Sequence, residues 1–353
     1  MDVRYSPEQK ALRDSVIQVV GNLGVSAVGN LDDAERRAKL DAAVAAAGWR
    51  ELRAADESGR PWASGVEVAI IAEELARGCA DTPFLGPTLA AELRRLAGAA
   101  PATAPETVLL TSDLGGIAVG DGATVDGMAV DAAGATSAVT LTARRAGDGR
   151  PGRWLLATAP VPTSVAGTDL TRSVASVTEA PTAPLLDQTT RLAGDGLDRV
   201  LALGLATTAA ELVGSMQGAV DLAVGYAAER RQYGQPVGSF QAVQHLLADA
   251  FVWTEGARSA ARHAAWAVDA LAPAEAVAAG AVAKAYAARA ARTVCETSIQ
   301  VHGGIGNTWE CLAHVHLRRV LLSTDVFGGV DANLNRVMDH ELAHAEGAAD
   351  GLR

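Results

Sequence analysis

The first hundred residues carry the apolar spacing of amphipathic helices. Near the start, Ser6 precedes Pro7 and an acidic residue, which is typical of a helix N-cap followed by proline in the first turn. Between residues 66 and 75, apolar side chains recur at helical spacing, and Gly78 then supplies a stop signal. We therefore expect residues 1–103 to form an N-terminal helical domain.

The pattern changes in the next segment. Apolar runs become short and are separated by Gly, Pro and Asp, as in VLLTS, GIAVG, SAVTLTA and RWLLATA. Short apolar runs between turn residues predict strands. Residues 104–190 are therefore expected to form a small middle β-domain, and Pro181 and Pro184 mark a linker at its end.

A long amphipathic helix is predicted after this linker. Its apolar positions recur at steps of three and four residues, at Leu212, Met216, Ala219, Val220, Ala223 and Ala227. Further helical segments follow, so residues 191–353 are expected to form a C-terminal helical bundle. The predicted fold class is mostly α with a small β-domain, in the order helix, sheet, helix.

Composition narrows the possible partners. Hydrophobic residues make up 49% of the chain but aromatic residues only 4%, so Ala, Val and Leu must fill the core. The net charge of -11 argues against nucleic acid, whose binding depends on Lys and Arg displacing counterions. Three cysteines without metal-ligand spacing predict reduced thiols. With no apolar signal segment or membrane span recognised, a cytoplasmic location is expected.

Two longer motifs lie in the C-terminal region. Residues 229–245 read ERRQYGQPVGSFQAVQH, and residues 300–310 read QVHGGIGNTWE. In this order and at this separation they resemble the signatures of the acyl-CoA dehydrogenase family. Weaker similarity continues at residues 168–172 and at Gly48 with Trp49, so the resemblance spans nearly the whole chain.

The resemblance implies a fold and a reaction. Family members have an N-terminal helical domain, a middle β-barrel-like domain and a C-terminal four-helix bundle, which is the order expected from the pattern alone. Compared with the family, residues 104–190 are expected to form a reduced middle β-domain. They bind FAD and desaturate an acyl-CoA thioester between its α and β carbons. Electrons then leave through an electron-transfer acceptor.

The resemblance also implies a set of cofactor-binding residues. Arg230 would hold the FAD pyrophosphate, because a guanidinium offers several donors in a fixed fork. Gln241 would contact the adenosine portion, and Tyr233 offers a flat apolar ring. The second motif contributes backbone N–H groups that two glycines leave open to a cofactor; its candidate residues are Gln300, Val301, His302, Gly303 and Gly304.

Structural alternatives exist for these residues. An arginine after a helix is often part of a surface ion pair, and a Gly-Gly pair is often a helix C-cap. Two signatures in the correct order favour the cofactor interpretation.

The residue that abstracts the α-proton is missing at its usual positions. By ungapped counting from the glycine pair, the family's glutamate falls on Phe327, and the alternative position early on the long helix falls on Gly204. Neither residue can accept a proton. Glu211, two helical turns beyond Gly204, and Asp325, two residues before Phe327, are the remaining candidates, and each is also compatible with a solvated or ion-paired carboxylate.

The flavin-ring end of the family site is also reduced. No counterpart of the loop and the Trp-bearing strand that cradle the isoalloxazine ring is recognisable, and Leu205 replaces the usual arginine beside Gly204. In the family, FAD lies across a subunit interface. The retained residues belong to the subunit that holds the cofactor tail, and the lost residues belong to the subunit that holds the ring.

This asymmetry predicts an accessory subunit of a heteromeric acyl-CoA dehydrogenase. Its partner would be a paralogous subunit in a heterodimer or an α2β2 heterotetramer. The chain resembles the short subunits of actinobacterial enzymes that act on bulky steroid acyl-CoA substrates.

Four other interpretations are compared with this one. A self-sufficient homo-oligomer would use Glu211 or Asp325 as its base, and a structural homologue would bind no flavin. A metal site at His314 and His316 is disfavoured, because side chains two residues apart on a helix diverge. A Rossmann nucleotide site is not supported either, because no Gly-x-Gly-x-x-Gly motif lies between a strand and a helix.

Overall fold

Four helices form the N-terminal part of the computed structural model, which describes residues 4–350 apart from 144–153, 164–166, 186–191 and 193. Two of them begin with capping boxes, in which Ser6 pairs with Gln9 and Ser64 pairs with Glu67, so each serine satisfies a free backbone N–H group. The helices are α1 (Pro7–Leu23), α2 (Ala34–Ala46), α3 (Gly65–Arg77) and α4 (Leu85–Leu96).

The middle of the chain forms a mixed sheet. Along it the order is β6, β3, β1, β4, β5, β7, and β2 pairs with β4 at one side. The β1–β4 and β2–β4 pairs are parallel and the other pairs are antiparallel. The strands are β1 (Glu106–Leu110), β2 (Val119–Gly120), β3 (Thr124–Val130), β4 (Ser137–Ala143), β5 (Trp154–Pro160), β6 (Val174–Pro181) and β7 (Ala183–Pro184).

The C-terminal part is a bundle around one central helix, α5. This helix packs on α3 as well as on α6 and α7. Small residues allow the close approach: a Cβ atom added to Gly214 would lie 1.9 Å from the backbone oxygen of Glu73 on α3. The bundle helices are α5 (Gly194–Glu229), α6 (Gln241–Ala270), α7 (Pro273–His302), α8 (Ala313–Asp325) and α9 (Val330–Asp350), with a short hairpin of β8 (Arg231–Gln232) and β9 (Gln235–Pro236) between α5 and α6.

Helix α5 is apolar enough to be compared with a membrane span. Its most apolar 18-residue window has a mean hydropathy of 1.3, yet 89% of that window is buried inside the protein. Such burial identifies α5 as the core helix of the bundle.

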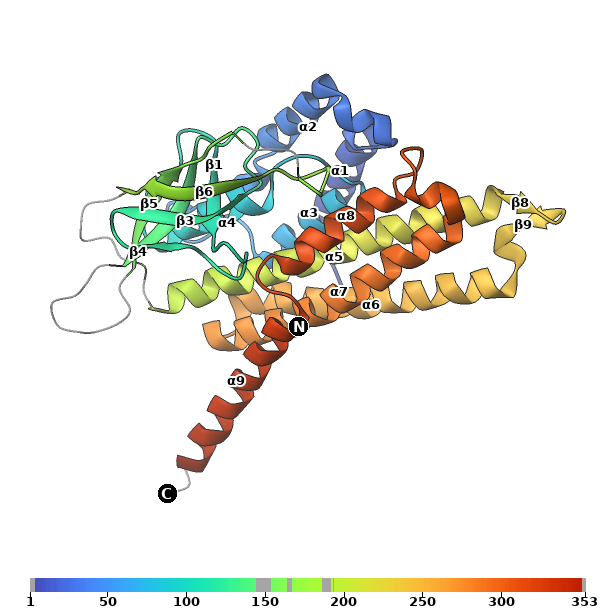
Figure 1. Cartoon of the computed structure of the whole chain (residues 1–353). Coiled ribbons are helices and arrows are strands. Elements are labelled where there is room, and N and C mark those ends of the chain that lie inside the picture. Colours follow the sequence, from blue (N-terminus) through green and yellow to red (C-terminus); the bar gives the residue numbers. More distant parts are fainter. Residues whose placement is uncertain (1–3, 144–153, 164–166, 186–191, 193, 351–353) are drawn as a thin grey trace.

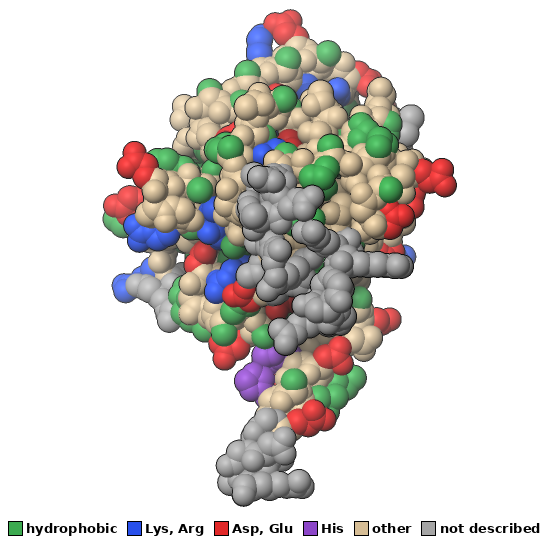
Figure 2. Space-filling model, turned by 90° about the vertical axis from the view of Figure 1, so that its left-hand side faces the viewer, with side chains coloured by type: hydrophobic (Ala, Val, Ile, Leu, Met, Phe, Trp, Pro, Cys, Tyr) green, Lys and Arg blue, Asp and Glu red, His purple; other side chains and the backbone are tan. Residues whose placement is uncertain are grey.

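The sheet and the β8–β9 hairpin lie at opposite ends of the bundle, and α9 projects away from the body (Figure 1). Seen from the sheet end, the described acidic and basic side chains are interspersed rather than gathered into a basic patch (Figure 2). The predicted fold class, mostly helical with a small β-domain, is confirmed.

Candidate functional site

The first sequence signature forms an exposed tip at the far end of the bundle. Arg230 follows α5 directly, and its backbone is fixed by hydrogen bonds from its N–H to Tyr226 (2.8 Å) and from the N–H of Val237 to its carbonyl (2.7 Å). The Arg230 side chain is exposed, and no hydrogen-bond or ion-pair partner for it is found among the described residues. Its guanidinium is therefore available to an external anion.

Tyr233 and Gln241 belong to the same tip. The Tyr233 side chain is 93% exposed, its backbone has φ +52°, and its ring meets Phe240 edge to face at 6.3 Å. Gln241 opens α6 and is also exposed, with His245 one turn further along the helix. Apart from this edge contact, the Tyr233 ring faces solvent on a backbone conformation that is unfavourable for a tyrosine.

The second signature lies next to the first one. The ring of Tyr226 on α5 stacks on His302 at the end of α7 with 4.6 Å between centroids. His302 is buried, and its Nδ1 lies 2.7 Å from the carbonyl oxygen of Ser298, whereas Gln300 is exposed and Val301 is half-buried. The second motif thus lies beside the last turn of α5, which leads directly into the first motif (Figure 1).

The two glycines of this motif have different roles. Gly303 is the C-cap of α7 and has φ +65° with ψ -144°, a conformation that favours glycine. Gly304 has no positive φ, is exposed, and a Cβ atom added to it would meet nothing within 4 Å. The first glycine is therefore explained by the fold, whereas the space in front of the second is open to another molecule.

The two usual positions of the catalytic base lie against each other at the opposite end of α5. Phe327 is fully buried, and a Cβ atom added to Gly204 would lie 2.5 Å from its Cε2. The phenylalanine ring therefore occupies the space beside α5 into which a carboxylate from either position would project.

The β1–β2 loop closes over this phenylalanine. The backbone N–H of Phe327 donates to the carbonyl of Leu114 at 2.8 Å, and Arg336 on α9 donates to the carbonyl of Gly115 at 2.9 Å. The β1–β2 loop therefore bonds directly to the turn that carries Phe327 and to α9.

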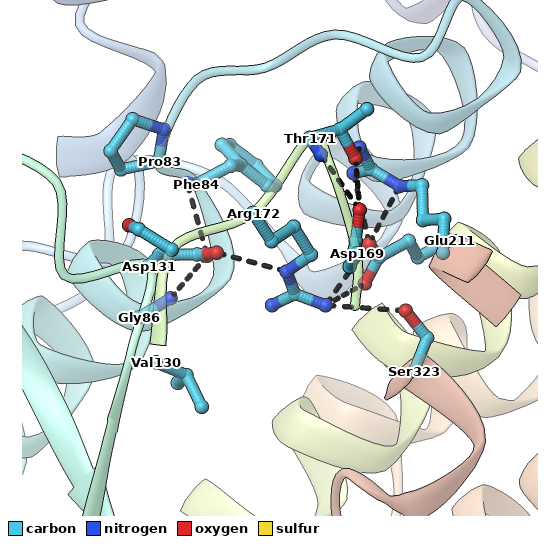
Figure 3. Close-up of polar contacts among 12 residues, drawn as sticks. Pro83, Phe84, Gly86, Val130, Asp131, Asp169, Thr171, Arg172, Glu211 and Ser323 are labelled. Carbon is cyan, nitrogen blue, oxygen red and sulfur yellow. Dashed lines mark hydrogen bonds and ion pairs between the residues drawn. The ribbon is translucent and has the colours of Figure 1, made fainter. Parts of the chain in front are cut away.

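Glu211 lies in a buried network of charges between the sheet and the bundle (Figure 3). Its carboxylate accepts hydrogen bonds from Arg172 Nη1 at 3.0 and 3.1 Å and from Arg319 Nε at 3.1 Å, and it forms an ion pair with Arg319 Nη2 at 2.9 Å. Both carboxylate oxygens are thus occupied, and the void beside them is only about 10 Å³, which is the space of one water. This environment favours the ion-paired alternative for Glu211.

Arg172 connects this network to the sheet. Its Nε donates to Asp131 at 2.9 Å, and Asp131 also accepts from the backbone N–H groups of Phe84 and Gly86. Burial alone would raise the pKa of Asp131, but the charge and hydrogen bond of Arg172 outweigh it, so the pKa lies below its ordinary value. Sequence reasoning singled out residues 168–172 only as a weak family motif and missed this role of Arg172.

Asp325 has a different environment. It is exposed at the end of α8 and lines a cavity of about 730 Å³ between the β1–β2 loop and the α8–α9 junction. The assignment of a catalytic base to Glu211 or Asp325, and of the cofactor tail to the exposed tip, stays a prediction.

Lys284 on α7 supports the turn that carries Phe327. Its buried ammonium group donates to the carbonyls of Thr324 (2.7 Å) and Gly328 (3.2 Å), and burial lowers its pKa to about 7 from 10.5. The charges that face it are Asp325 and Glu211, which raise the pKa, and Arg336, which lowers it. A neutral amine retains two donors and serves both carbonyls.

This lowered pKa makes the stability pH-dependent. Between pH 7 and 10.5 the unfolded chain binds a proton at Lys284 that the folded chain does not, so unfolding free energy rises with pH by up to about 1.4 kcal/mol per unit. We expect the stability advantage of the wild type over Lys284→Met to grow between pH 7 and 9 in urea unfolding. A difference that is constant with pH would contradict this assignment.

The histidines considered as metal ligands lie in separate environments. His316 is buried with its ring against the Cys79 thiol at 3.3 Å, and burial lowers its pKa to about 3. His314 instead contacts the ring of Trp309. Within the part of the chain that the structure describes, no three His, Cys, Asp or Glu side chains come together as a metal site.

Comparisons with known proteins identify the family. Residues 197–342 match the family model of the acyl-CoA dehydrogenase C-terminal domain. The chain is 31% identical to the acyl-CoA dehydrogenase IpdE2 of Mycolicibacterium smegmatis over 284 residues, which cover 80% of this chain and 81% of that protein. It is 33% identical to IpdE2 of Mycobacterium tuberculosis over 265 residues, covering 75% and 74%.

Solved structures share the fold over nearly the full length. A variant of the Tcur3481-Tcur3483 steroid ACAD superposes with a TM-score of 0.77 at 24% identity, covering 97% of this chain and 99% of that one. The ChsE4-ChsE5 complex from Mycobacterium tuberculosis gives 0.76 at 23% identity, covering 97% and 99%.

This chain belongs to the acyl-CoA dehydrogenase family. The family consists of flavin-linked oxidoreductases that act on CH–CH bonds, so the prediction of an oxidoreductase of this class is confirmed.

Proposed function

We propose that this chain is the accessory subunit of a heteromeric acyl-CoA dehydrogenase. It would hold the pyrophosphate and adenosine end of FAD, while a paralogous subunit supplies the catalytic base and surrounds the flavin ring. The observation that carries the proposal is the contrast between the two ends of α5: one end is closed by Phe327 packed on Gly204, and the other presents Arg230 without a described partner.

The residues at the exposed tip suit the tail of FAD. The Arg230 guanidinium can make charge-assisted hydrogen bonds to a pyrophosphate, and Gln241 can donate to and accept from an adenosine. The open space at Gly304 lets the backbone approach a bound group. When bound, FAD would accept the hydride from the β carbon of the thioester, and the residues of this chain would orient it and neutralise its phosphate charge.

Exposed apolar side chains on α6, the helix that begins at Gln241, support a protein partner. The first half of α6 is exposed on several faces although it carries large apolar residues: Phe251 is 52%, Val252 65% and Trp253 39% exposed, together with Leu246 at 39%. Such a surface is costly in water and is typical of an interface. Since Gln241 lies at the start of this helix, the proposed partner would cover both the apolar side chains and the cofactor tail.

A second apolar stripe fits the α2β2 form of the assembly. On the projecting helix α9, Leu334, Met338 and Leu342 recur every four residues and are more than half exposed. In a closed heterotetramer each chain makes at least two interfaces, and this stripe would provide the one that the tip does not.

The relatives guide the choice of partner and substrate. One structural neighbour is a steroid ACAD, and another is the two-component ChsE4-ChsE5 complex. By analogy we propose a steroid side-chain or other bulky acyl-CoA as the substrate, an electron-transferring flavoprotein as the electron acceptor, and the cytoplasm as the location.

Copurification tests the proposal. We expect the chain alone to be colourless and the chain coexpressed with a paralogous acyl-CoA dehydrogenase to be yellow, with one FAD per two chains. A yellow homo-oligomer of this chain that desaturates acyl-CoA would overturn the accessory role and favour the self-sufficient alternative. If the paralogous subunit binds the same amount of FAD without this chain as with it, the flavin-free homologue is favoured.

A further inference from the structure

Two histidines lie one turn apart on the projecting helix α9. His340 and His344 belong to the segment His-Glu-Leu-Ala-His, and their ring centroids are 4.5 Å apart with an interplanar angle of 67°. His340 is half-buried and His344 is exposed. Histidine side chains are visible at the surface of this helix where it leaves the body of the protein (Figure 2). The fold thus holds two imidazoles side by side and open to solvent.

This spacing suits the binding of one metal ion by both rings. Residues four apart on an α-helix share a face and are separated by about 6 Å along its axis. For this reason both histidines of a His-Glu-x-x-His helix can bind the same zinc ion. Because one rigid helix carries both rings, binding of the first imidazole holds the second at a high effective concentration. The pair should therefore bind a metal more tightly than two separate histidines.

The charges beside the pair favour a cation. Three exposed carboxylates flank the histidines: Asp339, Glu341 and Glu346. Arg336 lies one turn before His340, but its guanidinium is turned toward the body of the protein, where it donates to backbone carbonyls of the α8–α9 junction and the β1–β2 loop. The local charge therefore attracts a metal cation.

The pair lies on a different face of α9 from the apolar stripe of Leu334, Met338 and Leu342. At 3.6 residues per turn, the two faces are about 140° apart around the helix. A partner that covers the stripe would leave the histidines accessible. The metal site therefore does not depend on the proposed assembly.

We propose that His340 and His344 form a binding site for a divalent transition-metal ion of the zinc class. Each imidazole would supply one nitrogen ligand, and water would fill the other positions, because no third His, Cys, Asp or Glu ligand is found among the described residues. Imidazole ligands suit Zn²⁺, Ni²⁺ and Cu²⁺, whereas Mg²⁺ and Ca²⁺ prefer oxygen. By joining two turns, the ion would stabilise the C-terminal half of α9.

Calorimetric titration of the full-length chain, without an oligohistidine tag, tests this site. We expect Zn²⁺ to bind saturably with one ion per chain and Mg²⁺ not to bind in this way. His344→Ala should weaken Zn²⁺ binding by about tenfold or more, because a single imidazole remains. His263→Ala is the matched control: it removes an exposed histidine of α6 that has no histidine one turn away, and should leave the affinity within about twofold. No saturable Zn²⁺ binding, or equal affinity in His344→Ala, would overturn the proposal.

Moving one histidine separates the effect of spacing from that of number. His344→Ala combined with Ala345→His retains two histidines on α9 but places them five residues apart, so that their side chains diverge. We expect this variant to lose as much Zn²⁺ affinity as His344→Ala. In the wild type, Zn²⁺ should also slow hydrogen exchange of the backbone amides around residues 340–346. Undiminished affinity of the variant with altered spacing would mean adventitious binding only and would overturn the proposal, whatever the FAD content of the complex.

Discussion

Replacing Arg230 by alanine is expected to empty the heteromeric complex of FAD without unfolding this chain. The side chain is exposed and makes no described contact within the chain, so its removal should leave the free energy of unfolding within about 0.5 kcal/mol. A charge-assisted hydrogen bond to a phosphate contributes about 1.5–3 kcal/mol, so FAD affinity should fall about 10- to 100-fold. The rise in flavin fluorescence as FAD dissociates on dilution of the complex measures this affinity.

Arg231→Ala is the matched control for this measurement. Arg231 is the adjacent residue, is equally exposed and has the same charge, but lies within β8 rather than directly after α5. We expect it to lower FAD affinity less than about threefold, because a change in net charge alone is screened by salt. Equal losses of FAD affinity in both variants would mean that Arg230 contributes only its positive charge and makes no specific contact with FAD.

The helices and the order of the domains were predictable because their signals are local. The serine caps of α1 and α3 lie within three residues of their partners, and the periodic spacing of α5 is visible in any short window. The position of the second signature beside the end of α5 was not predicted. Periodicity alone says nothing of the stacking of Tyr226 on His302.

The buried charge network could not be predicted, because its partners are far apart in the chain. Arg172 and Arg319 lie 39 and 108 residues from Glu211. The closure of the β1–β2 loop over Phe327 is likewise set by tertiary packing rather than by spacing. Counting along the helix therefore makes Glu211, two turns from the usual base position, a reasonable candidate. Only its environment in the fold distinguishes a catalytic base from an ion-paired carboxylate.

Glu211→Gln separates those interpretations and should have the largest effect on stability. An amide in place of the carboxylate leaves two buried guanidinium groups without their shared anion, and the amide N–H₂ faces further donors. Removing one member of a buried ion pair costs about 3–5 kcal/mol. We therefore expect the urea unfolding midpoint of the full-length chain to fall sharply.

Activity supplies the second readout. If Glu211 holds the sheet against the bundle, the fraction of complex that assembles will fall, but kcat per assembled, flavin-loaded complex will change less than about threefold. If Glu211 were the base, kcat would be abolished in a complex of unchanged stability. Asp325→Asn is the control for both readouts: the carboxylate is exposed, so stability should stay within about 0.5 kcal/mol, and a loss of kcat in this variant alone would transfer the role of the base to Asp325.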